Sequence, residues 1–280
     1  MIEQHARVDG LNIRYLEQGS GPVLLLVHGG TLGFSADVWR STVEALAAKG
    51  YRVVAYDQPG FGGSDAPADF ALKYRQDFVA KFADALALQH PVLIGHSQGG
   101  GMVVGAALAA PQRFRAIVVM GTGSLLPPLA SPSRDVEASD TEPTVEDTHE
   151  LLKSNLYHHN IITPELLADY HRRCTGTHFA NALKRAQAGS AKSAVAGGAK
   201  SPAAPKPLWQ RLGEVPVPSL YIYGANDRAE AAARAGLARE RFPALTFHVL
   251  DQCHHIIQWD QPQKFIALTT DFLAALPPEA

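Results

Sequence analysis

The chain has 280 residues, of which 46% are hydrophobic and 19% are charged, and its formal net charge is −2. This composition excludes a disordered chain and fits one large domain, or one domain with an inserted subdomain. The charge pattern, without a basic stripe or an acidic tail, indicates no nucleic-acid or membrane partner. The N-terminus lacks the apolar run of a signal peptide and no stretch is long enough to span a bilayer, so we expect a cytoplasmic protein.

Strand and helix patterns alternate along the first 120 residues. We predict strands at residues 3–8, 11–18, 23–27, 53–56, 91–94 and 116–120, and helices at 38–49, 76–88 and after residue 101. Asp9-Gly10 is typical of a hairpin turn. The run 23–27 is apolar throughout, which is typical of a strand buried on both faces. The alternation predicts an α/β fold with a mostly parallel, eight-stranded sheet flanked by helices.

The same alternation returns at the C-terminal end but fails in the middle of the chain. Strands are predicted at 219–223 and 246–249, and helices at 229–241 and 261–275. Between them lie two expected helices, at 144–157 and 164–188, followed by Ala/Gly/Ser/Lys/Pro-rich sequence. We therefore predict a core of residues 1–123 and 208–280, with an inserted helical lid at 124–207. Its part near 189–207 is expected to be a flexible connector.

The sequence Gly95-His96-Ser97-Gln98-Gly99 matches the pattern G-x-S-x-G between a predicted strand and a predicted helix. In this context the glycines permit a tight turn that lifts the serine hydroxyl above the edge of the sheet. The N-terminus of the next helix then favours a developing oxyanion. Ser97 is therefore the predicted nucleophile. The plainer alternative is a glycine-rich turn that only packs the helix on the sheet.

An activated serine needs a base, and His255 follows the last predicted strand. In this kind of site the nucleophile, the acid and the histidine occur in that chain order, so we predict His255 as the base. Its neighbour His254 is the competitor, but adjacent loop residues usually point in different directions. For each histidine the alternative is an ordinary solvated loop residue.

The predicted acid is Asp227, in a loop that follows the strand at 219–223. This loop lies at the carboxyl end of a strand, where the sites of open α/β sheets assemble. A carboxylate there would fix the imidazole tautomer and stabilise the imidazolium. The alternative is an N-cap for the helix that starts near residue 229. Asp251 and Asp260 are weaker candidates because they lie too close to His255 in sequence.

The run His28-Gly29-Gly30-Thr31 directly follows the strand at 23–27. A glycine N–H in this loop can turn toward the reacting carbonyl and form an oxyanion hole with the N–H of Gln98. We predict Gly30 for this role and keep Thr31 as the alternative. His28 is expected to be structural, bonded to nearby loop backbone.

Taken together, these motifs resemble the α/β-hydrolase superfamily over almost the whole chain. Within it, the chain looks most similar to the branch that contains the meta-cleavage product hydrolases, which cut a carbon–carbon bond in ring-fission products of aromatic compounds. The similarity lies in the HGG loop, in residues 156–167 of the predicted lid and in the run from Cys253 to Asp260. The resemblance implies the α/β-hydrolase fold and a serine mechanism.

Three positions depart from the pattern of that branch. His96 stands where asparagine is typical, and Ile256 where tryptophan follows the histidine. Tyr170 stands near the place of a lid arginine that holds the dienoate, and Arg172 or Arg173 is left as its substitute. Histidine before the serine is common among esterases and lactonases of the superfamily. We expect substrate contacts from Thr31, His96, Tyr170 and Ile256.

The main prediction is hydrolysis of an ester or related acyl bond of a small, largely apolar substrate, through an acyl-enzyme on Ser97. The first alternative is C–C bond hydrolysis of a dienoate, and the second is a non-catalytic ligand-binding protein. Haloalkane dehalogenase and epoxide hydrolase chemistry use aspartate at the elbow, so Ser97 argues against both. This chemistry needs no cofactor, and no metal-ligand spacing is present. A homodimer is left open, since dimers are common in the fold.

Overall fold

The computed structural model describes residues 1–128, 140–196, 206–228 and 230–278. Within them, eight strands form one sheet in the order β1-β2-β4-β3-β5-β6-β7-β8. The strands are β1 (Ile2–Val8), β2 (Leu11–Gln18), β3 (Val23–Val27), β4 (Arg52–Tyr56), β5 (Val92–His96), β6 (Ala116–Met120), β7 (Ser219–Gly224) and β8 (Thr246–Leu250). β1 pairs with β2, and β2 with β4, in antiparallel fashion, and the remaining pairs are parallel. The predicted mostly parallel, eight-stranded sheet is confirmed.

The local sequence explains the turn between β1 and β2 and the burial of β3. Asp9 and Gly10 have φ values of 53° and 82°, which a two-residue hairpin turn of the favoured twist requires. In β3, alternate side chains enter two different apolar clusters, one on each face of the sheet. Leu25 and Val27 join one cluster, and Leu24 and Leu26 join the other. The strand is buried on both faces, as its unbroken apolar sequence predicts.

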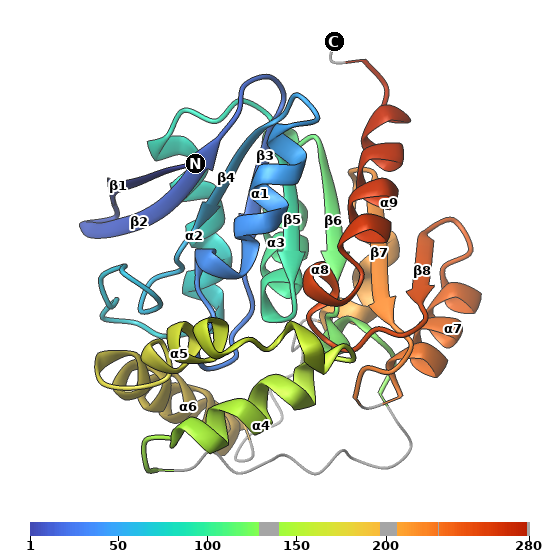
Figure 1. Cartoon of the computed structure of the whole chain (residues 1–280). Helices are drawn as coiled ribbons and strands as arrows, with labels where there is room; N and C mark the ends of the chain where they lie inside the picture. The colour runs from blue at the N-terminus through green and yellow to red at the C-terminus, as the bar shows by residue number, and fades with distance from the viewer. Residues whose placement is uncertain (129–139, 197–205, 229, 279–280) are drawn as a thin grey trace.

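Helices cover both faces of this sheet (Figure 1). On one face pack α2 (Leu72–Ala85), α3 (Gln98–Ala109) and α7 (Ala231–Arg241), and on the other pack α1 (Arg40–Ala47) and α9 (Pro262–Ala274). Short helical turns complete the core: η1 (Ala36–Trp39), η2 (Pro111–Arg113), η3 (Gly123–Leu125), η5 (Leu208–Glu214) and α8 (Ile257–Asp260). The parallel strands therefore all end at one edge, where their loops meet.

Between β6 and β7 lies a helical insertion, defined here as α4 (Val145–Asn155), η4 (His159–Ile161), α5 (Pro164–Arg172) and α6 (Thr177–Ala196). It lies across the edge at which the parallel strands end (Figure 1). The single helix predicted over 164–188 is divided, because Gly176 has φ 60° and interrupts the helical backbone between α5 and α6. α6 also continues through 189–196, where a flexible connector was expected. Residues 197–205 of that expected connector lie outside the described residues.

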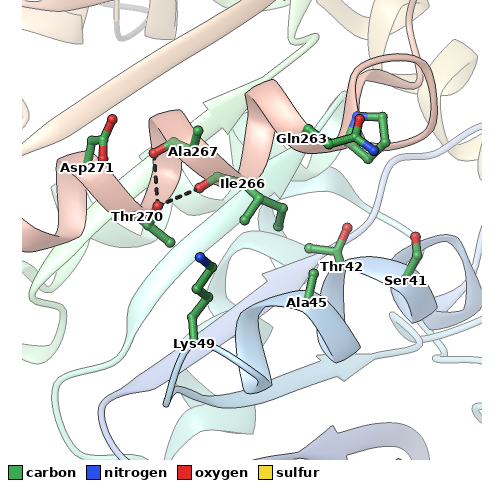
Figure 2. A pocket seen from close by; sticks show the side chains of 10 residues that line it. Ser41, Thr42, Ala45, Lys49, Gln263, Ile266, Ala267, Thr270 and Asp271 are labelled. Carbon is green, nitrogen blue, oxygen red and sulfur yellow. Dashed lines mark hydrogen bonds between the residues drawn. The ribbon is translucent and has the colours of Figure 1, made fainter.

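Two surface features lie apart from the predicted site residues. Figure 2 shows a groove between α1 and α9 in which Lys49 faces α9, while Thr270 donates a hydrogen bond back to its own helix, shared between the carbonyls of Ile266 and Ala267. On α4, Glu146, His149 and Glu150 bring possible metal-ligand atoms within 4.8 Å of one another. None of these residues belongs to the predicted site. Across the described part of the chain, no helix is both long and apolar enough to cross a membrane.

Candidate active site

Ser97 lies at the turn between β5 and α3, with φ 55° and ψ −126°. This is a strained conformation for a residue with a side chain, and the surrounding packing holds it. A Cβ on Gly95 would lie 2.5 Å from the Gly99 carbonyl oxygen, and one on Gly99 would lie 2.3 Å from the Val27 carbonyl oxygen. Only glycine fits at either place. The G-x-S-x-G pattern is therefore a steric requirement of this turn.

The structure brings Ser97, His255 and Asp227 together from three separate loops. The Ser97 Oγ lies 2.9 Å from His255 Nε2, and His255 Nδ1 lies 3.0 Å from Asp227 Oδ2. Burial raises the pKa of the Asp227 carboxyl, but its hydrogen bonds with His255 and the Arg228 N–H lower it, and the pKa ends below its usual value. Asp227 is thus ionised at neutral pH and accepts the Nδ1 proton, which leaves Nε2 free to accept from Ser97.

The loops that carry Asp227 and His255 are fastened to each other. The N–H of Ala225 donates to the Leu250 carbonyl at 2.8 Å, and that of Asn226 donates to the Cys253 carbonyl at 2.9 Å. A Cβ on Gly224 would lie 2.2 Å from the His254 carbonyl oxygen, so this close approach needs glycine. The alternative role of Asp227 as a helix N-cap is wrong, because Glu230 is the N-cap of α7.

The two nearby alternatives to His255 and Asp227 take other partners. The ring of His254 lies against Tyr157, with ring centroids 5.8 Å apart. The carboxylate of Asp260 accepts hydrogen bonds from the backbone N–H groups of Tyr157, His158 and His254, all at 2.8–3.0 Å. Asp260 therefore ties the helical insertion to the histidine loop and is not the acid partner of His255.

A second tie between insertion and histidine loop comes from the C-terminal end of α4. The carbonyl oxygen of Asn155 accepts the backbone N–H of His255 and that of Ile256, each at 3.1 Å. The Asn155 side-chain oxygen accepts from Arg228, the neighbour of Asp227. No periodicity or motif in the sequence marks Asn155, because a backbone carbonyl acceptor leaves no such signal.

We predict that Asp260→Ala lowers the free energy of unfolding by about 2–4 kcal/mol, because three backbone N–H groups lose a charged acceptor. It should also slow turnover, since the histidine loop loses one of its anchors. Denaturant unfolding followed by circular dichroism measures the first effect. Asp251→Ala is the matched control, since Asp251 is exposed in the same loop. An equal loss in both variants would contradict the anchoring role.

Gly30 and Gln98 lie next to each other beside Ser97. Gln98 is the first residue of α3, so its N–H has no acceptor within the helix. A Cβ on Gly30 would lie 2.0 Å from Gln98 Oε1, and one on Gly29 would lie 2.8 Å from the Ser97 Cβ. The glycines therefore make room for the serine turn. That the N–H groups of Gly30 and Gln98 hold an oxyanion stays a prediction, as does substrate contact by the half-buried Thr31.

His28 and His96 are both fully buried and neutral. Nε2 of His28 accepts from the Gln58 N–H at 3.0 Å, so Nδ1 carries the proton and donates to the Gly29 carbonyl at 2.7 Å. Nε2 of His96 donates to the His255 carbonyl at 2.8 Å. Burial lowers the pKa of each imidazole to about 3. His96 has no accessible surface in this structure and positions the His255 backbone; substrate contact by His96 stays a prediction.

We predict that His96→Asn weakens the acid sensitivity of the fold. The pKa of His96 lies near 3 in the folded protein, because burial disfavours the charged imidazole, against its usual 6.5. The unfolded chain therefore binds the extra proton first, and stability is lost as pH falls from about 6.5 toward 3, by about 1.4 kcal/mol per pH unit for this group. An asparagine amide keeps a donor for the His255 carbonyl but does not titrate. Urea unfolding between pH 4.5 and 6.5 measures the slope; an unchanged slope would contradict the buried neutral imidazole.

Two more residues expected to contact substrate, Tyr170 and Ile256, are buried in this structure, and their contact with substrate stays a prediction. Tyr170 is 1% exposed and its hydroxyl donates to the Leu32 carbonyl at 2.9 Å. Ile256 is 0% exposed. Arg172 pairs with Asp169 in solvent, while Arg173 pairs with Asp169 and donates from Nε to the Gly33 carbonyl at 3.1 Å. Tyr170 and Arg173 therefore fasten α5 to the loop after β3, and neither arginine is bonded to a residue of the serine site.

The fold and this site define a class of protein. Residues 22–262 match the family model described as the alpha/beta hydrolase fold. The chain belongs to this family, and it is a hydrolase of the branch that contains the meta-cleavage product hydrolases.

Curated relatives support that branch, and a solved structure shares the fold. The chain is 30% identical to a 2-hydroxy-6-oxononadienedioate/2-hydroxy-6-oxononatrienedioate hydrolase of Paraburkholderia phymatum, over 94% of this chain and 91% of the relative. It is 27% identical to a 2-hydroxy-6-oxo-6-phenylhexa-2,4-dienoate hydrolase of Burkholderia cepacia, over 95% and 93%. A hydrolase of the latter name from Rhodococcus sp. strain RHA1 superposes with a TM-score of 0.81 at 21% identity, covering 98% and 99% of the two chains.

Proposed function

We propose that the protein is a serine hydrolase that cleaves the carbon–carbon bond beside the 6-oxo group of a 2-hydroxy-6-oxo-dienoate. This substrate class is taken from the names of two relatives, each of which aligns with more than 90% of this chain. The observation that carries the proposal is the continuous hydrogen-bonded series Ser97–His255–Asp227, with Ser97 at the N-terminus of α3. We take residues 124–207, which include the helical insertion, as the lid over this site.

The first step of the proposed reaction is addition to the 6-oxo carbon. His255 Nε2 takes the proton of the Ser97 hydroxyl while Oγ attacks, and the negative charge develops on the carbonyl oxygen. The N–H groups of Gly30 and Gln98 stabilise that oxygen. Ionised Asp227 stabilises the imidazolium that forms.

The second step breaks the bond between C5 and C6. It requires the keto form of the substrate, in which the 2-hydroxy proton has moved to C5. The electron pair of the broken bond then spreads through the conjugated chain onto the oxygen at C2, which takes the proton held by His255. The acyl group remains on Ser97, and a water molecule deprotonated by the same histidine releases it as a carboxylic acid. One water is consumed for each substrate.

The test is incubation of the purified protein with 2-hydroxy-6-oxo-6-phenylhexa-2,4-dienoate. The proposal expects loss of the dienoate absorbance with formation of benzoate and 2-hydroxypenta-2,4-dienoate in equal amounts. If the wild-type protein forms neither product, the proposal that it acts on 2-hydroxy-6-oxo-dienoates is wrong.

Hydrolysis of carboxylic esters is the second candidate. The same three residues perform it, and the chain superposes with a TM-score of 0.79 on a solved membrane phospholipase A, at 26% identity and covering 98% of this chain and 86% of that one. Short-chain p-nitrophenyl esters test it, with an initial burst of nitrophenol as the mark of an acyl-enzyme. A larger kcat/KM for these esters than for the dienoate would favour this candidate over the first.

A further inference from the structure

The backbone of Ser97 is held from β6 and from the loop that follows it. The Ser97 N–H donates to the Met120 carbonyl at 2.9 Å. The Ser97 carbonyl accepts from the Thr122 hydroxyl at 2.8 Å and from the Gly100 N–H at 3.0 Å. The Thr122 side chain therefore binds the peptide group that joins Ser97 to Gln98.

Thr122 is 1% exposed, and its own position is fixed by neighbouring elements. Its carbonyl accepts from the hydroxyl of Tyr223, on β7, at 3.3 Å. A Cβ on Gly100 would collide with Thr122 Oγ1, so the glycine in the first turn of α3 makes room for this hydroxyl. The hydroxyl also lies 3.2 Å from the Met120 carbonyl, but it carries one proton and the Ser97 carbonyl is the nearer acceptor.

The direction of the Ser97 carbonyl sets the direction of the Gln98 N–H. Both belong to one planar, trans peptide group, in which they point to opposite sides. Ser97 has φ 55° and ψ −126°, a strained conformation that contacts with neighbouring groups must hold. A hydrogen bond to the carbonyl also polarises the amide, which makes its N–H a stronger donor. The Thr122 hydroxyl therefore acts on the Gln98 N–H through this peptide group.

We propose that Thr122 is a positioning residue, whose hydroxyl orients and polarises the peptide group that supplies the Gln98 N–H to the oxyanion. It acts through that group and does not touch the substrate. The inference rests on the proposed function for the oxyanion, but it holds for any carbonyl that Ser97 attacks. The effect of Thr122 should therefore appear when negative charge is on the carbonyl oxygen, and not when an uncharged ketone binds.

The test compares two ketones, trifluoroacetophenone and acetophenone. With the first, Ser97 Oγ adds to the carbonyl carbon, the hydroxyl proton passes to His255, and the π electrons of the carbonyl move to its oxygen as an oxyanion. Acetophenone, whose carbonyl is far less electrophilic, binds without this addition. Fluorine NMR titration measures the affinity of the adduct, and competition by acetophenone in the same titration measures binding without addition.

Thr122→Val keeps the shape of the side chain but removes the hydroxyl. It should weaken the trifluoroacetophenone adduct by about 10-fold, less than the effect of losing a whole oxyanion-hole donor. Acetophenone binding should be unchanged. Thr122→Ser restores the hydroxyl and should restore the adduct. Thr269→Val is the matched control, because Thr269 is also buried but its hydroxyl has no hydrogen-bond partner among the described residues.

An adduct of unchanged affinity in Thr122→Val would overturn the proposal. Equal weakening of both ketones would also overturn it, because that is the mark of a merely structural role. The same holds if Thr122→Ser fails to restore the adduct, or if the wild-type protein forms none. Thermal melting identifies a variant that does not fold, and Thr122→Ala then replaces Thr122→Val in both titrations.

The ketones also separate this proposal from the reaction itself. A wild-type protein that forms the Thr122-dependent adduct but releases no benzoate from the dienoate would overturn the proposed reaction and leave the role of Thr122 standing. Benzoate release at the wild-type rate by Thr122→Val, with an unweakened adduct, would leave the reaction standing and overturn the role of Thr122.

Discussion

Replacing Ser97 with alanine is expected to lower kcat for the dienoate by about 10⁴- to 10⁶-fold, because the variant has no nucleophile to form the acyl-enzyme. The fold should be unaffected, since the change removes one oxygen atom from a half-buried side chain. Stopped-flow and overnight assays of benzoate release together cover this range of rates. Ser41→Ala, at an exposed serine in the groove of Figure 2, is the matched control and should keep the wild-type rate.

A Ser97→Ala protein that kept more than about one per cent of the wild-type rate would contradict the acyl-enzyme. The remaining route would be direct attack by water, with His255 as the base that deprotonates it. His255→Ala separates the two cases, because it removes the base from either route.

Asp227→Asn is expected to lower kcat by about 10³- to 10⁴-fold. The amide would turn an N–H donor or a weaker acceptor toward Nδ1 and so favour the wrong tautomer of His255. It would also remove the negative charge that stabilises the imidazolium. The depressed pKa of Asp227 shows that the folded protein favours the ionised acid, so the loss should persist across neutral pH.

The measurement is the rate of benzoate release from pH 6 to 9, with Asp251→Asn as the control because it removes a charge from an exposed position nearby. Equal rates for Asp227→Asn and the wild-type protein would assign Asp227 a role in loop structure only. Reduced rates in both variants would point to a general charge effect.

Sequence patterns predicted the features that depend on neighbouring residues. The strand predicted at 116–120 coincides with β6, because a short, unbroken apolar run between turns favours a strand buried on both faces. The serine turn was predictable because the G-x-S-x-G pattern is local; Gly95 is required by the backbone of Gly99 inside the motif, although Gly99 is required by the Val27 carbonyl at the end of β3. Chain order then indicated Asp227 and His255, which the structure brings to Ser97.

Features that depend on packing between distant segments could not be predicted in the same way. Arg75 and Arg185 are 110 positions apart, and only the folded chain shows that both reach Phe61. His96 follows the strand pattern of β5, but no pattern shows that its ring turns to the His255 carbonyl. The break between α5 and α6 was missed because a single glycine inside a helical pattern is often tolerated.

The Asn155 carbonyl accepts the backbone N–H groups of both His255 and Ile256. This contact limits which changes of substrate specificity the protein can acquire by evolution. Specificity in such folds is usually altered by exchanging the segment above the site. Here a transplanted segment must also supply a carbonyl at the place of Asn155, or His255 loses its support. The effect of a mutation in the insertion therefore depends on its position. Mutations in α5 and α6 leave the Asn155 contact unchanged, while mutations at the end of α4 disturb the position of His255 and so affect proton transfer. Recombination between relatives should succeed most often when the junction keeps the end of α4 with the histidine loop.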